Sequence, residues 1–360
     1  MHYTLHLTAN CNMRCHYCYV SPTSVTMTPE TARAAVDSAV KRGHKSIGLI
    51  FFGGEPLIYR ELIIDIINYT KTYADRGIKF YYKMTTNGLL LDEKFMDIAI
   101  KEKMYIALSI DGIDKAHNAH RISSDGGPTH EKVEGAAKLL LKSHANAPAL
   151  MTVNPDTVQY YNESVEYLYA LGFQYLICSL NYDAEWDKLA LKELKHQYEL
   201  LADFYYKNTL AENKFYLSPF EVKISSHVHN KTYCHERCEL GKWQVSVGPD
   251  GTIYPCVQFV GEEKYSIGDV FNGIDEVKRE NLFDQNETEK PGCDICNIRA
   301  RCNHYCACLN KQSTGSINMV SPILCAHERI ILPIADKVAE RLYETRNTTF
   351  LQKHYNDFHL

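Results

Sequence analysis

The segment SIGLIFFGGEP, residues 46–56, is the stretch that decides the fold of this chain. Its first part, Ser46–Phe52, is a nearly continuous apolar run that stops at the pair Gly53-Gly54. Apolar runs of this length, without polar alternation, are typical of parallel strands that are buried on both faces. The segment therefore predicts a buried strand that ends in a tight, glycine-containing loop.

Strand and helix patterns alternate on both sides of this strand. The other predicted strands are Tyr3–Leu7, Lys79–Thr85, Tyr105–Ile110, Ala149–Val153 and Tyr175–Leu180. The predicted helices are Pro29–Arg42, Arg60–Tyr73, Glu93–Lys101, His130–Lys142, Thr157–Ala170 and Asp187–Leu210. Strict alternation favours parallel βαβ units and an α/β fold. Six such units over about 210 residues are compatible with an open α/β sheet or with an incomplete α/β barrel.

Polar and glycine-rich groups follow several of the predicted strands, at the point where each strand ends. In both candidate folds, chemistry gathers at the carboxyl ends of parallel strands. The groups found there are Cys11, Gly53-Gly54-Glu55, Thr86-Asn87-Gly88, Ser109 with Asp111, and Asn154. The sequence thus predicts one functional edge of the sheet.

Composition excludes several classes of protein. The chain has 360 residues, of which 45% are apolar and 23% charged, and a net charge of −5, so wholesale disorder and charge-driven nucleic-acid binding are both disfavoured. No apolar run approaches 18 residues, and the N-terminus lacks a secretory signal, which argues against a membrane partner. The 13 cysteines then indicate metal ligands or reactive thiols in a reducing compartment, and we expect a cytoplasmic protein.

The cysteines are unevenly distributed along the chain. Three lie between Cys11 and Cys18, nine lie between Cys234 and Cys325, and Cys178 stands alone in an apolar run where it is expected to pack as a small hydrophobe. The Cys-dense region has too little apolar sequence to fold by burial alone, so metal centres would stabilise it. We therefore predict three parts: a body (1–225), a Cys-rich domain (226–329) and a C-terminal helical tail (330–360).

The first cysteine group has the spacing C-x3-C-x2-C, from Cys11 through Cys15 to Cys18. Three thiolates can hold three irons of a four-iron cluster and leave the fourth iron open. A zinc site that borrows a histidine such as His16 is the alternative. The position directly after the first predicted strand favours the cluster.

The segment from Cys11 to Cys18, with Tyr17 before the third cysteine, resembles the cluster motif of the radical S-adenosylmethionine (radical SAM) enzymes. The resemblance implies a partial (β/α)6 barrel whose open iron chelates S-adenosylmethionine and cleaves it to a 5′-deoxyadenosyl radical. Gly53-Gly54-Glu55-Pro56 resembles the segment that binds the methionine amino group, with the glycines allowing close backbone approach and Glu55 placed near an ammonium. The further cofactor contacts that the resemblance implies are Tyr17, Asn87, Ser109, Asp111 and Arg121, with Asp111 alternatively buttressing its own loop.

The second cysteine region contains C-x3-C, Gly-x4-Cys and a C-x2-C-x5-C-x3-C series that is followed by a final cysteine. A zinc ribbon or two zinc knuckles would use such pairs. The ordered series instead resembles the SPASM extension of radical SAM enzymes, which carries two auxiliary four-iron clusters and brings the total to three. The resemblance assigns Cys234, Cys238, Cys256 and Cys306 to the first auxiliary cluster, and Cys293, Cys296, Cys302 and Cys325 to the second. Cys308 is a possible substitute ligand, and an open iron results if Cys234 does not bind.

The same resemblance implies oxidation of a side chain in a ribosomally made peptide, with a flavodoxin or ferredoxin as electron donor and possibly a separate peptide-recognition protein. The stretch from Ile253 to Gly261 resembles enzymes that form thioether crosslinks from a substrate cysteine. Formylglycine-forming relatives carry an aspartate after the Gly-x4-Cys motif, where this chain has Val257, and a carbon–carbon-crosslinking enzyme is a further alternative. A zinc-binding interaction or RNA-binding module is the alternative from another class, and no catalytic base can be assigned from the sequence.

Overall fold

The computed structural model describes residues 1–230 and 238–355, and these residues form two compact units. The first unit consists of Met1–Ser109, His120–Ala147 and Glu239–Asn286. The second unit consists of Ile110–Ala119, Pro148–Cys238 and Glu287–Leu360. Within the described residues, no helix has the length and apolar character needed to cross a membrane.

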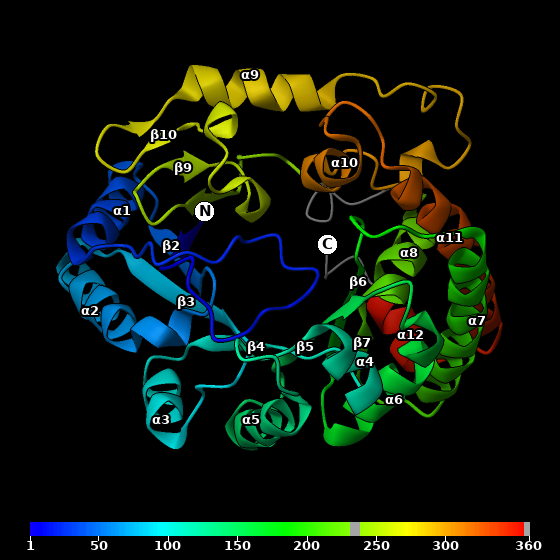
Figure 1. Cartoon of the computed structure of the whole chain (residues 1–360). Helices are drawn as coiled ribbons and strands as arrows, with labels where there is room; N and C mark the ends of the chain where they lie inside the picture. The colour runs from blue at the N-terminus through cyan, green and yellow to red at the C-terminus, as the bar shows by residue number, and fades with distance from the viewer. Residues whose placement is uncertain (231–237, 356–360) are drawn as a thin grey trace. The chain divides into compact units, whose positions relative to one another are not determined.

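Parallel strands form the sheet of the first unit (Figure 1). The strands β1 (His2–His6), β2 (Ser46–Phe52), β3 (Lys79–Thr86) and β4 (Tyr105–Ser109) pair in sequence order and in parallel. On the other side of β1 lies β8 (Gln244–Val247), also parallel, followed by the antiparallel β9 (Ile253–Tyr254). Part of the Cys-dense region therefore extends the sheet of the body. A separate antiparallel pair is formed by β10 (Gly268–Asp269) and β11 (Gly273–Ile274).

The helices of the first unit are α1 (Pro29–Lys41), α2 (Arg60–Lys71), α3 (Glu93–Lys101), α5 (His130–Ser143) and α9 (Glu276–Glu287). Helix α1 begins where Thr28 accepts a hydrogen bond from the backbone N–H of Thr31, with Pro29 in the first turn. Its alanine- and valine-rich face is fully buried, as are the inward residues of β1 and β2. Helices α1 and α2 pack side by side (Figure 1).

The second unit has the parallel strands β5 (Pro148–Val153), β6 (Tyr175–Leu180) and β7 (Tyr216–Leu217). The long helices α7 (Lys188–Leu210) and α11 (Pro322–Glu344) pack against each other, and α8 (Ser218–His229) packs on α11 (Figure 1). The remaining helices are α6 (Tyr161–Leu171), α10 (Ala307–Thr314) and α12 (Thr348–His354), and the short α4 (Asp114–His120) follows β4.

The α/β fold with parallel strands is confirmed, and the predicted strands and helices of the body are observed with their ends shifted by at most about four residues. One boundary is wrong: the last long helix begins at Pro322 rather than near Ile330. Ser321 caps it by accepting from the backbone N–H of Leu324, and Pro322 occupies the first helical position, so Cys325 lies inside this helix. The division into 1–225, 226–329 and 330–360 stays a prediction.

Two glycines fit the end of β2 against the loop that follows β1. Gly53 has φ +131°, and a Cβ on it would lie 2.3 Å from the carbonyl oxygen of Thr8. A Cβ on Gly54 would lie 2.0 Å from the carbonyl oxygen of Asn10. The backbone N–H of Gly54 donates to Thr8 at 2.8 Å, and that of Glu55 donates to Asn10 at 2.9 Å. The glycines were expected to admit a ligand, and in the structure they admit the backbone that leads into the cysteine loop.

We expect Gly54→Ala to displace this loop, because a methyl group cannot share space with a backbone carbonyl. The thermal unfolding midpoint should fall by about 5 °C or more. Gly135→Ala is the matched control: Gly135 lies within α5 with open space around its Cβ position, so alanine should leave the midpoint equal or slightly higher. Equal midpoints for the two variants would contradict the packing argument.

The C-terminal helix α12 is held by a buried carboxylate on α8. Glu221 accepts a hydrogen bond from the Tyr205 hydroxyl at 3.0 Å and pairs with Lys353 and with His354, the latter at 3.4 Å. Burial alone would raise the pKa of Glu221, but His354 and Lys353 outweigh it and hold that pKa below its usual value. The charged Glu221 therefore stabilises the docked helix fully at pH values above the pKa of a free glutamate. This contribution is lost as the pH falls through the lowered pKa of Glu221.

Glu221→Gln should weaken the docking of α12. Breaking a buried pair on one side typically costs about 3 kcal/mol, so hydrogen exchange of α12 amides at pH 7 should accelerate on the order of 100-fold. After correction for intrinsic rates, the difference between wild type and variant should shrink below about pH 4. Glu199→Gln, which removes an exposed partner of Lys195, is the control and should leave α12 exchange unchanged. A variant with wild-type exchange at pH 7 would refute this role of Glu221.

Candidate functional site

The cysteine loop after β1 is fixed in place by backbone hydrogen bonds. The backbone N–H of Leu7 donates to Phe52 at 2.9 Å, which continues the β1–β2 pairing into the loop. Farther along, Arg14 donates to Ile122 at 2.9 Å and His16 donates to His120 at 3.0 Å. The loop is thus held between the end of β2 and the segment 120–123.

All three thiols of this loop line one cavity of about 130 Å³, together with Gly54. Cys11 and Cys15 are half-buried and Cys18 is exposed. The Cys11 sulfur accepts from the backbone N–H of Met13 at 3.4 Å and from the Asn87 amide at 3.6 Å. Burial raises the pKa of Cys11, against the opposing effect of these two donors. Three thiols around one cavity, with N–H groups directed at a sulfur, fit a four-iron cluster that is bound by three cysteines.

Glu55 lies behind the cysteine loop and is fully buried. Its carboxylate accepts from the backbone N–H of Leu57 at 3.0 Å, the Thr86 hydroxyl at 2.8 Å and the backbone N–H of Asn87 at 2.8 Å. Burial raises the pKa of Glu55, and these donors oppose that effect. The carboxylate caps the 3-10 turn Pro56–Tyr59 and joins the carboxyl ends of β2 and β3. Contact with a methionine amino group stays a prediction.

Asn87 connects β3 to the cysteine loop. Its side-chain amide donates to Asn12 at 2.8 Å as well as to the Cys11 sulfur, and its carbonyl oxygen accepts from the backbone N–H of Leu89. Asn12 was not singled out from the sequence, since an asparagine inside a cysteine loop has no distinguishing pattern. These contacts orient the amide of Asn87 toward the thiols.

Tyr17 and Arg121 also meet at this edge of the first unit. The Arg121 guanidinium donates to the Tyr17 hydroxyl at 2.8 Å and lies 3.8 Å from the sulfur of Met13. Arg121 is buried, and its positive charge lowers the pKa of Glu55 relative to burial alone. The structure therefore brings Tyr17 and Arg121 together with the cysteine loop.

The group after β4 is divided between the two units. Ser109 ends β4 and is half-buried in the first unit. Asp111 belongs to the second unit, where its carboxylate accepts from the backbone N–H of Thr152 at 3.0 Å and its backbone N–H donates to His117 at 3.3 Å. Asp111 thus buttresses the start of its loop against β5. Its predicted contact with the cofactor, like that of Ser109, stays a prediction.

Four cysteines of the second unit gather near the start of α11. Cys296 and Cys302 line one cavity of about 460 Å³. Burial raises the pKa of Cys293, and the neighbouring thiols of Cys296 and Cys325 raise it further. Cys325 affects Cys302 in the same way. Four thiols can supply all the ligands of a four-iron cluster without a histidine. This donor set therefore fits the second auxiliary cluster that the resemblance implies.

The four ligands assigned to the first auxiliary cluster are distributed differently. Cys238 and Cys306 lie in the second unit and are hydrogen-bonded to each other, and the Cys308 sulfur is 3.5 Å from that of Cys306. Cys256 lies in the first unit, just before the 3-10 turn Val257–Phe259. Cys234 lies outside the described residues. Ligation by this set stays a prediction.

Cys178 lies in β6 beside Tyr161, and burial raises its pKa to about 12. A thiol with such a pKa is almost entirely protonated at neutral pH and is a poor nucleophile. This agrees with a packing role.

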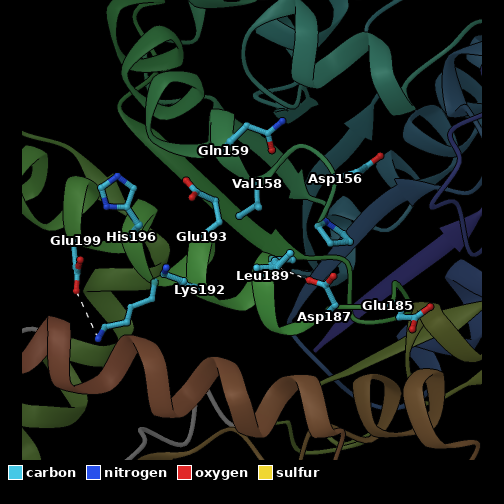
Figure 2. Close-up of a pocket in the computed structure, with 13 residues that line it drawn as sticks. Asp156, Val158, Gln159, Glu185, Asp187, Leu189, Lys192, Glu193, His196 and Glu199 are labelled. Carbon is cyan, nitrogen blue, oxygen red and sulfur yellow. Dashed lines mark hydrogen bonds and ion pairs between the residues drawn. The ribbon is translucent and has the colours of Figure 1, made fainter.

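A cavity of about 910 Å³ in the second unit is lined by none of these cysteines. It is open and is lined by acidic and basic side chains of α7 and of the segment after β5, with Lys195 and Glu199 paired at 3.9 Å (Figure 2). None of the predicted site residues lines it.

Comparisons with known proteins agree with this geometry. The family model "Radical SAM superfamily" matches residues 5–168. A cysteine-type anaerobic sulfatase-maturating enzyme of Clostridium perfringens is 25% identical over 302 residues, which cover 78% of this chain and 79% of that protein.

Two solved structures show the same fold. That of anSMEcpe with bound AdoMet and Kp18Cys peptide superposes with a TM-score of 0.83 at 21% identity and covers 96% of this chain and 100% of the other. That of Streptococcus suis SuiB bound to its precursor peptide SuiA superposes with a TM-score of 0.63 at 16% identity and covers 90% of this chain and 75% of the other. The family model therefore identifies residues 5–168 as a radical SAM domain, and the two solved structures share the α/β fold of this chain.

Proposed function

We propose that this enzyme binds S-adenosylmethionine at the loop Cys11–Cys18 and oxidatively modifies a side chain of a peptide. The observation that carries the proposal is the single cavity that Cys11, Cys15, Cys18 and Gly54 share. Relatives and structural neighbours that mature sulfatases or bind a precursor peptide support the peptide as substrate.

A four-iron cluster with S-adenosylmethionine supplies a 5′-deoxyadenosyl radical on one-electron reduction. The residues of this chain position that chemistry. Asn87 donates to the Cys11 sulfur, and N–H···S contacts of this kind stabilise a thiolate ligand. Glu55 and the glycines before it fix the loop, and Arg121 with Tyr17 adds a positive group and a ring at its border. The proposed cofactor contacts are Tyr17, Gly53, Gly54, Glu55, Pro56, Asn87, Ser109, Asp111 and Arg121.

The proposed enzyme would carry two further four-iron clusters in its Cys-dense region, and they would accept the second electron that leaves the peptide. Cys293, Cys296, Cys302 and Cys325 would hold one of them. Cys234, Cys238, Cys256 and Cys306 would hold the other, with Cys308 as a substitute ligand because its sulfur lies 3.5 Å from that of Cys306. A flavodoxin or ferredoxin would supply the electron that reduces the cluster at Cys11–Cys18. A separate protein would aid peptide recognition.

For the product, we propose a thioether formed from a substrate cysteine. The carbon would give a hydrogen atom to the 5′-deoxyadenosyl radical, the thiol would lose a proton to solvent, and the second electron would pass to an auxiliary cluster as the C–S bond forms. Val257, next to the proposed ligand Cys256, provides no carboxylate base for the formylglycine reaction. The second candidate is formylglycine formation, which the similarity to cysteine-type sulfatase-maturating enzymes favours.

Replacing Cys11, Cys15 and Cys18 with Ala should abolish cleavage of S-adenosylmethionine. After anaerobic reconstitution, the wild type should hold about twelve irons and the variant about eight, since only one of three clusters is lost. The measurements are iron and sulfide content and release of 5′-deoxyadenosine. Cys178→Ala is the control and should keep both properties at wild-type values. Stoichiometric zinc with no visible absorption band would end the proposal.

The product can be determined by mass spectrometry of synthetic peptides that contain either Cys or Ser. A thioether keeps the sulfur and loses two hydrogens, whereas formylglycine from Cys loses the sulfur. We expect modification of the Cys peptide alone, with sulfur retained. Val257→Asp introduces the carboxylate that formylglycine-forming relatives carry at this position. The variant tests whether the missing base alone prevents formylglycine formation in this enzyme. Sulfur loss with the wild-type enzyme would refute the thioether and favour the second candidate.

A further inference from the structure

Arg329 touches two of the four thiols that would hold the second auxiliary cluster. It lies on α11 one turn after Cys325, so both side chains point to the same side of the helix. One guanidinium nitrogen donates to the Cys296 sulfur at 3.5 Å, and the side chain also hydrogen-bonds to Cys325. A single cation thus bridges ligands from α11 and from the loop that precedes α10.

Two other cations near these thiols, Lys223 and Arg299, are paired with carboxylates. Lys223 pairs with Glu328 at 2.7 Å, and both side chains are buried. Arg299 pairs with Glu289. Among the described residues, Arg329 makes no ion pair with a carboxylate, and its hydrogen bonds are to thiols. Arg329 is therefore a cation whose described contacts are with ligand thiols rather than with a carboxylate.

A cation with N–H donors favours the reduced form of an iron–sulfur cluster. Reduction adds one electron to a cluster that is already negative with its four thiolates, so nearby positive charge stabilises the product more than the reactant. Hydrogen bonds to the ligand sulfurs act in the same direction, and both are known determinants of cluster potential. Because Arg329 is exposed, water screens part of its charge, and the effect should be moderate.

We propose that Arg329 raises the reduction potential of the cluster held by Cys293, Cys296, Cys302 and Cys325. The couple is one electron taken up by the oxidised cluster, with no bond broken and no proton moved. This inference rests on the proposed function, because it needs a cluster at that site. Arg329 would act on the reaction only through the cluster, by placing a positive charge next to its ligand thiols. It is therefore a positioning residue and not a catalytic residue.

The test is an anaerobic redox titration followed by electron paramagnetic resonance. The full chain carrying Cys11→Ala, Cys15→Ala and Cys18→Ala serves as the parent, so that only the auxiliary clusters contribute. Cys296→Ala in the parent shows which of the two titration steps belongs to the second cluster. Arg329→Gln removes the charge, Arg329→Lys keeps it, and Arg341→Gln is the matched control, since Arg341 lies on the same helix beside Asp203 and Tyr206.

In Arg329→Gln we expect the iron content to stay at about eight irons per chain. The midpoint reduction potential should fall for the second cluster only. At a fixed potential, the ratio of reduced to oxidised second cluster should fall about three- to tenfold. Arg329→Lys should fall between Gln and the parent, and Arg341→Gln should match the parent. Unchanged midpoints in Arg329→Gln at eight irons would overturn the inference. Loss of about four irons in both Arg329 variants would also overturn it, because Arg329 would then be needed to hold the cluster. A parent with only about four irons would refute the second auxiliary cluster itself, and the inference with it.

Discussion

The site depends on one buried carboxylate that joins two strand ends. Glu55 has no exposed surface and accepts three hydrogen bonds, from Leu57, Thr86 and Asn87. A buried carboxylate without such donors would cost several kcal/mol, so the ends of β2 and β3 must stay together for the carboxylate to be tolerated. Asn87 transmits this constraint to the cysteine loop through its contacts with Asn12 and Cys11.

The sequence predicted the strands of the body well because buried parallel strands have a simple signature. Ser46–Phe52 and Tyr175–Leu180 were predicted with their observed bounds, since apolar runs that stop at polar or glycine residues leave little choice of register. Two-residue strands such as β7 carry no such pattern. The start of α11 was missed for a related reason, because the cysteines before Ile330 suggested a loop and hid the cap at Ser321.

The candidate site was predictable as a set of positions but not as a set of roles. The cysteine spacing and the strand ends identified Cys11, Gly53–Glu55 and Asn87, and the family resemblance added Arg121. What Gly54 does could not be read from the sequence, because a glycine needed for a ligand and one needed for a passing backbone look the same. Only the 2.0 Å approach to the Asn10 carbonyl distinguishes them. The roles of Asn12 and Met13 could not be predicted from the sequence, because their contacts with Asn87 and Cys11 arise only from the conformation of the folded loop.

Two buried tyrosines help to hold α11 in the second unit. His327 lies between two buried hydroxyls, Tyr182 at 2.9 Å from one ring nitrogen and Tyr198 at 2.7 Å from the other. A neutral imidazole has one donor and one acceptor, so one tyrosine donates and the other accepts, and burial lowers the pKa of His327 to about 3. Because both ring nitrogens are occupied, a rotation of α11 would break two buried hydrogen bonds at once. His327 lies between Cys325 and Arg329 in sequence, so the same pair of tyrosines sets the direction in which those two side chains leave the helix.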